Sequence, residues 1–341
     1  MQIEHNVSLK NHTTFRMGPL VRYFAFIHTL SELTDALKIA RQKNIPPIIL
    51  GGGSNTIIKD DTELASIVLK IKIRGIDIIE DHTQYSVIEI GAGEDWDEVV
   101  AYSVTKNLRG IEALSAIPGT AGATPIQNVG AYGQEIADTL ISLRAYEISS
   151  GNIRVFTKAE CEFGYRESVF KNKLKNQYVI LSITLKLHKD APEIPNYPNI
   201  HKYFKEQSIE QPTLAQIREA IINIRKNKLP DPKEIASVGS FFKNPIVPKE
   251  HSKLIKTAYP DAVIFEVNDS MDKIAAGWMI DALGFKGKTF GNLMFYKHNA
   301  LVLVNTGDAT YQELALLVSF IQRAVYEKFK ITLEQEPVVL N

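Results

Sequence analysis

The sequence predicts an α+β protein of about two domains, and three observations carry that prediction. The chain has 341 residues, whereas one domain takes roughly 150. The first third alternates helix and strand patterns, and the last third shows helices and strands again after a proline-rich stretch. Apolar residues at 45% and charged residues at 23% are ordinary globular values, which exclude a wholly disordered or fibrous chain.

The elements of the first half follow from hydrophobic spacing. Residues 33–43 place four apolar side chains on one helical face, and acidic residues open a second helix near Asp95. The full order is a helix at 33–43, strands at 45–50, 66–71 and 85–93, a helix from 95, and strands at 140–148 and 178–187.

The second half begins with a proline-rich polar stretch at 189–212, which we interpret as a linker or surface excursion. A compact α+β unit is expected after it. Its predicted helices lie at 213–227, 248–257, 273–283 and 310–329, and its predicted strands at 262–267 and 300–304, with a strand-like tail at 331–340.

Charge and cysteine content exclude several classes of protein. Basic and acidic residues balance at 39 each, so no global basic field exists to hold nucleic acid or a membrane surface. The single cysteine, Cys161, excludes an intramolecular disulfide framework and is expected to be a buried small residue. The eight histidines show no ligand spacing, so no metal is predicted. We see no secretory signal and no apolar run long enough for a membrane helix, so a cytoplasmic protein is expected.

Two stretches have the composition of ligand-binding loops. A run of three glycines, a serine and an asparagine at 51–55 follows an apolar strand, and without Cβ atoms its backbone N–H groups can close on an anion. Its spacing fits neither the dinucleotide-binding nor the P-loop motif, so a plain tight turn stays an alternative. Residues 110–133 are dense in Gly, Ala and Pro, which suits a large flat polar ligand or a structural loop.

Single residues add chemical candidates. Arg166 follows a tyrosine and is suited to hold a carboxylate or developing negative charge, although a surface ion pair with Glu162 or Glu167 is the plainer interpretation. Ser240 follows a glycine and precedes two phenylalanines, but no His–Asp partnership makes it a hydrolase nucleophile. The basic cluster at 171–175 is expected to be a solvated turn.

These segments, in this order, resemble the MurB family of UDP-N-acetylenolpyruvoylglucosamine reductases, flavoenzymes of bacterial peptidoglycan synthesis. The resemblance runs from the NHTTF segment at 11–15 to the LEQE segment at 333–336. It rests on the glycine turn, the IPGTAG loop at 117–122, the GYRES segment at 164–168 and the GSFFKNP segment at 239–245. The 189–212 excursion, with its tyrosine, is similar to the type I form of the family.

The resemblance implies an FAD-binding module of the vanillyl-alcohol-oxidase/PCMH type and a separate α+β substrate-binding domain. The implied division is 1–75 and 76–211 for two FAD-binding subdomains, 212–325 for the substrate-binding domain, and 326–341 for a tail returning to the active site. It implies non-covalent FAD, NADPH as co-substrate, and reduction of UDP-N-acetylglucosamine enolpyruvate to UDP-N-acetylmuramate by a cytoplasmic protein, which we expect to be a monomer.

Residue by residue, the resemblance assigns Ser240 as proton donor, with Arg166 and Glu336 as the other catalytic residues. Glu334 is a weaker competitor for the role of Glu336, and Asn299 and Ala282 stand where glutamine is usual. The implied substrate contacts are Tyr197, Arg225, Lys228, Asn244 and Asn299, and Tyr165, which adjoins Arg166, is expected to contact the substrate or NADPH. The implied flavin contacts are Gly51, Gly52, Gly53, Ser54, Asn55, Ile117, Pro118, Gly119, Thr120, Gly122, Gln127, Asn128, Gly130, Ala131, Tyr132 and Gly133.

Two other hypotheses remain at this point. One is another flavoenzyme of the same superfamily, such as an oxidase of a small alcohol. Those enzymes commonly hold flavin through a covalent His or Cys link, and the glycine-rich segments show no suitably placed one. The other is a catalytically inactive protein that binds flavin or a UDP-sugar, against which the joint presence of Arg166, Ser240 and Glu336 argues.

Overall fold

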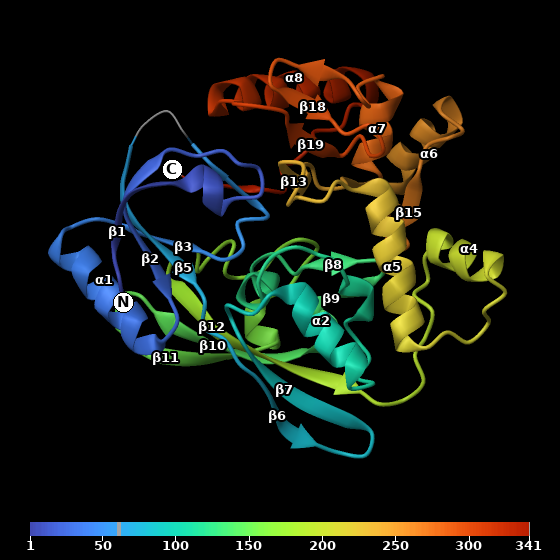
Figure 1. The fold of residues 1–341 in the computed structure, drawn as a ribbon. Coiled ribbons are helices and arrows are strands. Elements are labelled where there is room, and N and C mark those ends of the chain that lie inside the picture. The colour runs from blue at the N-terminus through green and yellow to red at the C-terminus, as the bar shows by residue number, and fades with distance from the viewer. Residues whose placement is uncertain (60–62, 341) are drawn as a thin grey trace. The chain divides into compact units, whose positions relative to one another are not determined.

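The structure is a computed structural model that describes residues 1–59 and 63–340. The chain forms two compact units and passes between them five times, after Val7, Leu20, Gly53, Leu64 and Lys226. The first unit consists of Met1–Val7, Val21–Gly53 and Ala65–Lys226, and the second of Ser8–Leu20, Ser54–Leu64 and Asn227–Asn341. Figure 1 follows the chain through both. The division into four functional parts stays a prediction.

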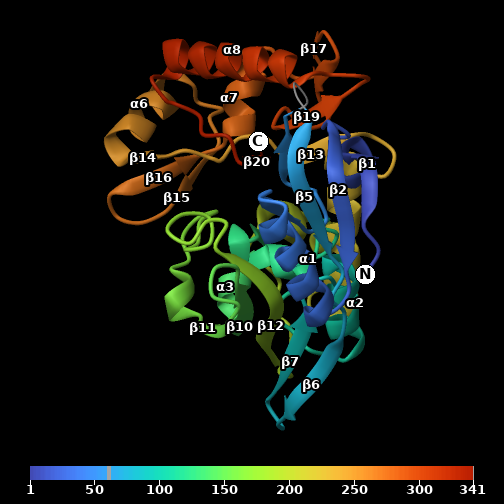
Figure 2. The same cartoon turned by 90° about the vertical axis from the view of Figure 1, so that its left-hand side faces the viewer.

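A four-stranded sheet in the order β1-β2-β5-β3 forms one part of the first unit. Its strands are β1 (Glu4–Ser8), β2 (Leu20–Ile27), β5 (Leu64–Ile71) and β3 (Pro47–Leu50). Helix α1 (Leu30–Gln42) covers one face of this sheet (Figure 2). The predicted helix is confirmed and begins three residues earlier than expected, because Thr29 accepts the backbone N–H of Glu32 at 3.2 Å and caps it.

A five-stranded antiparallel sheet in the order β11-β10-β12-β7-β6 forms the other part. Its strands are β11 (Ile153–Thr157), β10 (Leu140–Glu147), β12 (Tyr178–His188), β7 (Tyr85–Gly91) and β6 (Ile76–Asp81). Helix α2 (Trp96–Thr105) begins after Asp95, whose carboxylate accepts two backbone N–H groups of the first turn.

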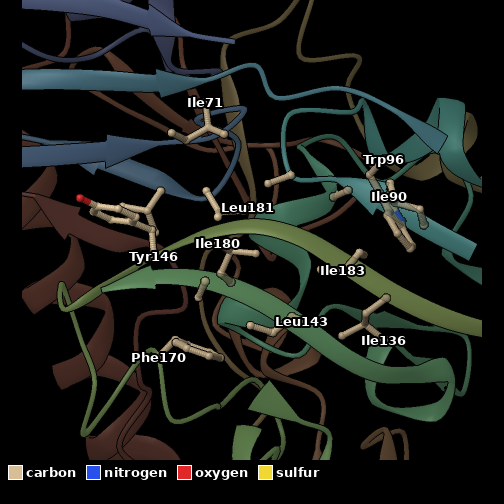
Figure 3. Packing of buried hydrophobic residues seen from close by; sticks show 14 of the residues in the cluster. Ile71, Ile90, Trp96, Ile136, Leu143, Tyr146, Phe170, Ile180, Leu181 and Ile183 are labelled. Carbon is tan, nitrogen blue, oxygen red and sulfur yellow. The ribbon is translucent and has the colours of Figure 1, made fainter. Parts of the chain in front are cut away.

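One hydrophobic core serves both sheets of the first unit. Figure 3 shows Ile71 of β5, Ile90 of β7 and Ile183 of β12 in the same apolar interior as Trp96 of α2. The indole of Trp96 is fully buried and donates to the carbonyl of Leu114 at 3.2 Å, so its polar end is satisfied. The core therefore fixes the loops that follow β3 and β7 on one scaffold.

Short elements complete the first unit. They are η2 (Glu112–Leu114), η3 (Ala121–Ile126), β8 (Gly130–Ala131), β9 (Gln134–Glu135), α3 (Ile136–Thr139), η4 (Ala159–Cys161), α4 (Pro198–Glu206) and α5 (Leu214–Lys228). Of the two interpretations of 189–212, a linker or a surface excursion, the linker was wrong for Pro198–Glu206, because α4 lies there and buries Ile200 and Phe204 against α5. Pro198 opens that helix at a position where a missing N–H costs nothing.

The described residues of the second unit form three small sheets. Their strands are β13 (Ser237–Ser240), β19 (Val302–Asn305), β18 (Leu293–Phe295) and β17 (Thr289–Phe290) in one, β14 (Ile246–Pro248), β16 (Met271–Ile274) and β15 (Ile264–Glu266) in another, and β20 (Val338–Leu340) and β4 (Thr56–Ile58) in the third. Its helices are η1 (Leu9–His12), α6 (Lys249–Ala258), α7 (Ala276–Ala282) and α8 (Tyr311–Phe329), with α8 beside α7 (Figure 2).

Two N-terminal segments belong to the core of the second unit. Phe15, Met17 and Ile57 are buried there together with residues from α7 and α8. The tail strand β20 pairs in parallel with β4, Val338 opposite Thr56. Hydrophobic spacing gives no sign of this arrangement, because the partners are nearly 300 residues apart.

Candidate active site

The turn after β3 consists of glycines because its neighbours leave no room for side chains. A Cβ on Gly51 would lie 2.6 Å from Thr120 Oγ1, and a Cβ on Gly52 would lie 2.8 Å from Gly119 Cα. Gly53 has a φ of +71°, in the left-handed region that favours glycine. The structure thus brings together, within the first unit, two loops that the sequence analysis assigned to one cofactor.

The loop at 117–122 lies along the segment that follows β7. The backbone N–H of Ala121 donates to Glu94 O, and that of Gly122 donates to Ala92 O, both at 2.9 Å. A Cβ on Gly122 would lie 2.5 Å from the Cβ of Ala92. The loop is therefore held by its backbone, and no residue in it carries an ionisable side chain.

Asn128, a predicted flavin contact, is 1% exposed and makes three hydrogen bonds to the protein itself. Its Nδ2 donates to Glu135 Oε2 at 2.6 Å and to Gly164 O at 3.0 Å. Its Oδ1 accepts the backbone N–H of Ala137 at 3.2 Å. Asn128 therefore ties the β8–β9 hairpin to the loop that carries Arg166.

Arg166 lies against that hairpin in the first unit. Its Nη2 donates to Gly130 O at 2.6 Å, and its Nη1 lies 3.8 Å from a carboxylate oxygen of Glu135. The guanidinium also lies over the ring of Tyr165, 5.1 Å from the ring centre. Arg166 has a φ of +56°, and Lys171 Nζ donates to its carbonyl at 3.1 Å. Predicted catalytic and flavin-contacting residues thus share one hydrogen-bonded cluster.

The prediction of a solvated basic turn at 171–175 is wrong for Lys171. Its side chain is 16% exposed and pairs with Glu167 at 3.5 Å, besides holding the Arg166 carbonyl. Lys173 fits the prediction, since it is exposed and pairs with Glu162. Sequence spacing does not distinguish these two lysines, because the difference lies in how the loop folds back on itself.

Tyr132, Tyr197 and Arg225 form a second cluster in the first unit. The two tyrosine rings meet edge to face with centres 5.2 Å apart, and the Arg225 guanidinium lies close enough to act on the pKa of Tyr132. Arg225 Nε donates to Ala116 O at 3.2 Å. Burial raises the pKa of both tyrosines and lowers the pKa of the Arg225 guanidinium. A desolvated cation between the Tyr132 phenol and the Asp97 carboxylate is suited to an anionic ligand. Lys228 lies one helical turn further along α5, and burial lowers its pKa.

A carboxylate that the sequence analysis did not single out fixes the peptide in front of the 117–122 loop. Asp97 accepts the backbone N–H of Ala116 at 2.6 Å and a two-point ion pair from Arg218 at 2.6 and 2.9 Å. Ala116 has a φ of +56°, so the chain there is held in an uncommon conformation from both sides.

Ser240 and Glu336 are neighbours within the second unit. Ser240 ends β13, and Gly239, with a φ of +77°, shifts the register between Ser237 and Ser240 against β19. The backbone N–H of Glu336 donates to Phe241 O at 2.9 Å, one residue beyond Ser240. The fold thus brings together two of the three predicted catalytic residues, nearly 100 positions apart in the chain.

The competing carboxylate, Glu334, has a partner of its own. Lys243 Nζ lies 2.6 Å from Glu334 Oε1, and the two residues are also joined by a backbone hydrogen bond. The Lys243 side chain is 8% exposed, so this pair is mostly shielded from water on the lysine side. Glu334 is therefore held to the segment after β13 by both its side chain and its backbone.

The two asparagines predicted to contact the substrate come from loops and lie next to the first residues of α7. Asn244 Oδ1 accepts the backbone N–H of Ala276 at 2.9 Å, and Asn299 Oδ1 accepts that of Leu301 at 3.0 Å. A Cβ added to Gly277 would lie 3.7 Å from Asn299 Oδ1. Because both carbonyl oxygens bind backbone donors, both amide NH₂ groups have a fixed orientation.

The remaining predicted flavin contacts lie next to these elements. Ser54 and Asn55 follow the glycine turn, and Asn55 O accepts the backbone N–H of Val338 at 3.0 Å in the second unit. The others are in the first unit: Ile117 and Pro118 in the loop, Gln127 after η3, Ala131 in β8, and Gly133 at the hairpin tip with a φ of +87°.

Other chemistry is limited in the part of the chain that the structure describes. Residues 1–59 and 63–340 contain no group of three or more His, Cys, Asp or Glu placed to hold a metal ion. Cys161 is fully buried, and burial raises its pKa to about 12, as for an inert thiol. Among the helices of these residues, none is long and apolar enough to cross a membrane.

Comparison with solved structures identifies the fold. A UDP-N-acetylenolpyruvylglucosamine reductase from Thermus caldophilus superposes with a TM-score of 0.70 at 24% identity and 100% coverage of both chains. p-Cresol methylhydroxylase superposes with a TM-score of 0.51 at 12% identity, covering 96% of this chain and 83% of the other. At such identities the likeness shows the fold alone. The predicted fold class, α+β with the fold shared by vanillyl-alcohol-oxidase/PCMH-type proteins, is confirmed.

Sequence comparison identifies the family. Residues 21–157 match the family model of an FAD binding domain, and residues 231–340 match that of the UDP-N-acetylenolpyruvoylglucosamine reductase C-terminal domain. The reductase of Flavobacterium johnsoniae is 42% identical over 341 residues, covering 100% of both chains. That of Pseudomonas fluorescens is 40% identical over 337 residues, covering 99% of this chain and 98% of the relative. The chain therefore belongs to the MurB family of UDP-N-acetylenolpyruvoylglucosamine reductases.

Proposed function

We propose that the glycine-lined surface of the first unit holds FAD, and that Arg166, Ser240 and Glu336 act on the substrate. The chain is a flavin-dependent oxidoreductase that reduces UDP-N-acetylglucosamine enolpyruvate to UDP-N-acetylmuramate with NADPH, in peptidoglycan precursor synthesis. The observation that carries the cofactor assignment is the meeting of the 51–53 turn with the 117–122 loop, where Cβ atoms have no room.

The residues present fit this cofactor. A diphosphate needs close approach of backbone N–H groups, which glycines permit, and a flat ring system needs small uncharged neighbours. Both are supplied by the turn and the loop. When bound, FAD supplies the chemistry of hydride transfer from NADPH to the β-carbon of the enolpyruvyl group.

Arg166 stabilises the negative charge that develops on the substrate carboxylate and α-carbon. A guanidinium held by Gly130 O and by the nearby Glu135 carboxylate keeps its orientation before the charge appears, so little reorganisation is needed during reaction. The cluster around Asn128 fixes the backbone on which this arginine depends.

Ser240 delivers the proton to the α-carbon, and Glu336 orients the hydrogen-bond network around the substrate carboxylate. A serine hydroxyl is a weak acid, so it must be held at the reacting carbon, and a bulged strand end fixes such a position. The backbone bond between Glu336 and Phe241 keeps the two groups in register.

The nucleotide half of the substrate is assigned to the aromatic and basic residues. Arg225 and Lys228 meet the diphosphate, since both cations are desolvated, and Tyr197 covers the base side. Tyr165 contacts the substrate next to Arg166. Asn244 and Asn299 donate their oriented amide NH₂ groups to the sugar nucleotide.

We further propose that the protein acts in the cytoplasm as a monomer. Balanced charge and a single buried cysteine suit a reducing compartment. Light scattering on the purified protein at working concentration is expected to give the mass of one chain, and a dimer mass would contradict the monomer.

Anaerobic stopped-flow spectroscopy tests the function. The purified protein is expected to be yellow, to bleach on mixing with NADPH, and to regain its colour on adding UDP-N-acetylglucosamine enolpyruvate. An inactive flavin-binding protein would stay yellow with NADPH. An oxidase would bleach with a small alcohol and regain colour with oxygen. A colourless protein that is folded and takes up no added FAD would overturn the cofactor assignment.

A further inference from the structure

Ala116 has an uncommon backbone conformation at the point where two parts of the proposed site meet. Its φ of +56° lies in the left-handed region, which is unfavourable for a residue with a Cβ and which glycine adopts freely. The residue is nevertheless an alanine, and it stands directly before the 117–122 loop. Such a conformation persists only where the surrounding groups hold it.

Two charged side chains hold the two ends of this residue. The Asp97 carboxylate accepts the Ala116 N–H at 2.6 Å, and Arg225 Nε donates to the Ala116 carbonyl at 3.2 Å. Burial acts to raise the pKa of Asp97, but the hydrogen bonds from Arg218 and from the Ala116 N–H outweigh it, so this pKa lies below its usual value. Asp97 is therefore an anion at neutral pH, and its bond to Ala116 is charge-assisted.

An ion pair also joins Asp97 to α5, the helix that carries Arg225. Nη1 and Nη2 of Arg218 donate to the two carboxylate oxygens of Asp97 at 2.6 and 2.9 Å. Arg218 and Arg225 are seven positions apart on α5, about two turns, so both lie on one face of the helix. Asp97 is thus linked to Arg225 in two ways, through the Ala116 peptide and through α5.

The 117–122 loop depends on Asp97 less than Arg225 does. The Gly119 carbonyl accepts the backbone N–H of Trp96 at 3.1 Å, and further backbone bonds hold the last two residues of the loop. These bonds remain when the Asp97 side chain is removed. The loss of this carboxylate is therefore expected to act on Arg225 more than on the proposed cofactor loop.

We propose that Asp97 is a positioning residue for substrate binding, because it holds the Ala116 carbonyl where that carbonyl orients Arg225. This inference rests on the proposed function, in which Arg225 meets the diphosphate of the sugar nucleotide. With Nε bound to Ala116, the guanidinium is oriented before the anion arrives, which lowers the cost of binding. Without Asp97, the Ala116 peptide leaves its left-handed conformation and Arg225 loses this orientation.

Binding of UDP-N-acetylglucosamine enolpyruvate to the oxidised, FAD-loaded protein tests this inference. Without NADPH there is no turnover, so isothermal titration calorimetry measures the Kd directly. Asp97→Ala is expected to raise this Kd about 10-fold, because one charge-assisted hydrogen bond is lost. In stopped-flow experiments the substrate concentration that half-saturates flavin reoxidation should rise by the same factor. The limiting reoxidation rate and the Kd for FAD should stay within about threefold.

Glycine at position 116 separates positioning from folding. Because glycine adopts the left-handed conformation without help, adding Ala116→Gly to Asp97→Ala is expected to return the substrate Kd to within about threefold of that of the unaltered protein. Arg218→Met removes the ion pair and leaves the bond between Asp97 and Ala116, so its Kd should also stay within about threefold. The matched control is Glu98→Ala, an exposed acid in the same first turn of α2, which is expected to change none of these quantities.

The outcomes distinguish this inference from the proposed function. If Asp97→Ala binds the substrate normally, or if Ala116→Gly does not restore its binding, the inference is wrong while the reductase assignment stands. It is equally wrong if Arg218→Met weakens binding as much as Asp97→Ala, because the ion pair then acts through the stability of α5. If Arg225→Met leaves the Kd unchanged, the assignment of Arg225 is wrong and the inference falls with it. If the unaltered, FAD-loaded protein binds no substrate, the proposed function itself fails.

Discussion

The two units build their parts of the proposed site by different means. In the first unit the glycine turn and the 117–122 loop approach so closely that a Cβ at Gly52 would lie 2.8 Å from the Gly119 backbone. In the second unit, Ser240 at the end of β13 and Glu336 in the segment before β20 offer functional groups, and a backbone hydrogen bond between Glu336 and Phe241 joins the two segments. The glycine-lined part in the first unit therefore depends on how large its side chains are. The part in the second unit depends on which functional groups its side chains carry. Cofactor affinity and chemistry are therefore expected to respond to different substitutions.

The largest effect expected is that of Ser240→Ala. It removes the proposed proton donor and leaves the first unit untouched, so NADPH should reduce the bound flavin at near-normal rate. Reoxidation by UDP-N-acetylglucosamine enolpyruvate should slow by about 10²- to 10⁴-fold, the usual contribution of a general acid. Stopped-flow absorbance of the two half-reactions measures both rates.

The control for Ser240→Ala is Ser237→Ala on the same strand, which also removes a hydroxyl and is expected to leave reoxidation within about threefold. If Ser240→Ala slows flavin reduction and flavin reoxidation equally, Ser240 has a structural role. The proposed division of roles between the two units would then be wrong.

Gly52→Ala tests the opposite side of the comparison. The added methyl group meets the Gly119 backbone, which cannot rotate away, so the two loops must separate. We expect the Kd for FAD to rise about 10²-fold or more, with the remaining bound flavin reacting normally. Gly164→Ala is the control, because its Cβ would meet only Glu167 Cβ at an ordinary 3.7 Å. Unchanged FAD affinity in Gly52→Ala would mean that the close approach is unrelated to the cofactor.

Lys171→Met should give the smallest effect. It removes the donor to the Arg166 carbonyl and leaves the arginine in place. Reoxidation is expected to slow about 10-fold because Arg166 is less well positioned, while FAD affinity and reduction by NADPH stay within about twofold. Lys173→Met, an exposed lysine in the same loop that pairs with Glu162, is the control and should behave normally. If reoxidation, FAD affinity and reduction by NADPH all change, Lys171 stabilises the loop and does not position Arg166 for catalysis.

Local pattern predicts some of the regular elements, such as α1 and α2, and misses strands such as β2, β6 and β11. The four apolar side chains of α1 recur three or four residues apart, and the acids of α2 lie in its first turn, so both signals can be seen in a short piece of sequence. Helix α4 was not predicted, because a proline-rich polar sequence suggests a linker or surface excursion. Its Pro198 stands in the first turn of the helix, where proline is tolerated.

What the sequence leaves out depends on distant partners. Lys171 differs from Lys173 because the loop returns it to the carbonyl of Arg166, which sequence spacing does not show. The site residues themselves come from a family resemblance and stay predictions. The structure adds to them which residues share a cluster, such as Arg166 with Gly130 and Glu336 with Phe241.

The repeated passage of the chain between the two units has a consequence for how the protein can be divided. Phe15, Met17 and Ile57 come from segments that are inserted between pieces of the first unit, yet they fill the interior built by α7 and α8. No single cut in the polypeptide separates the units, so a fragment that begins at Asn227 lacks both part of its apolar interior and the partner strand of β20. Because each unit is built from three separate pieces of the chain, evolution cannot exchange either unit as one continuous gene segment.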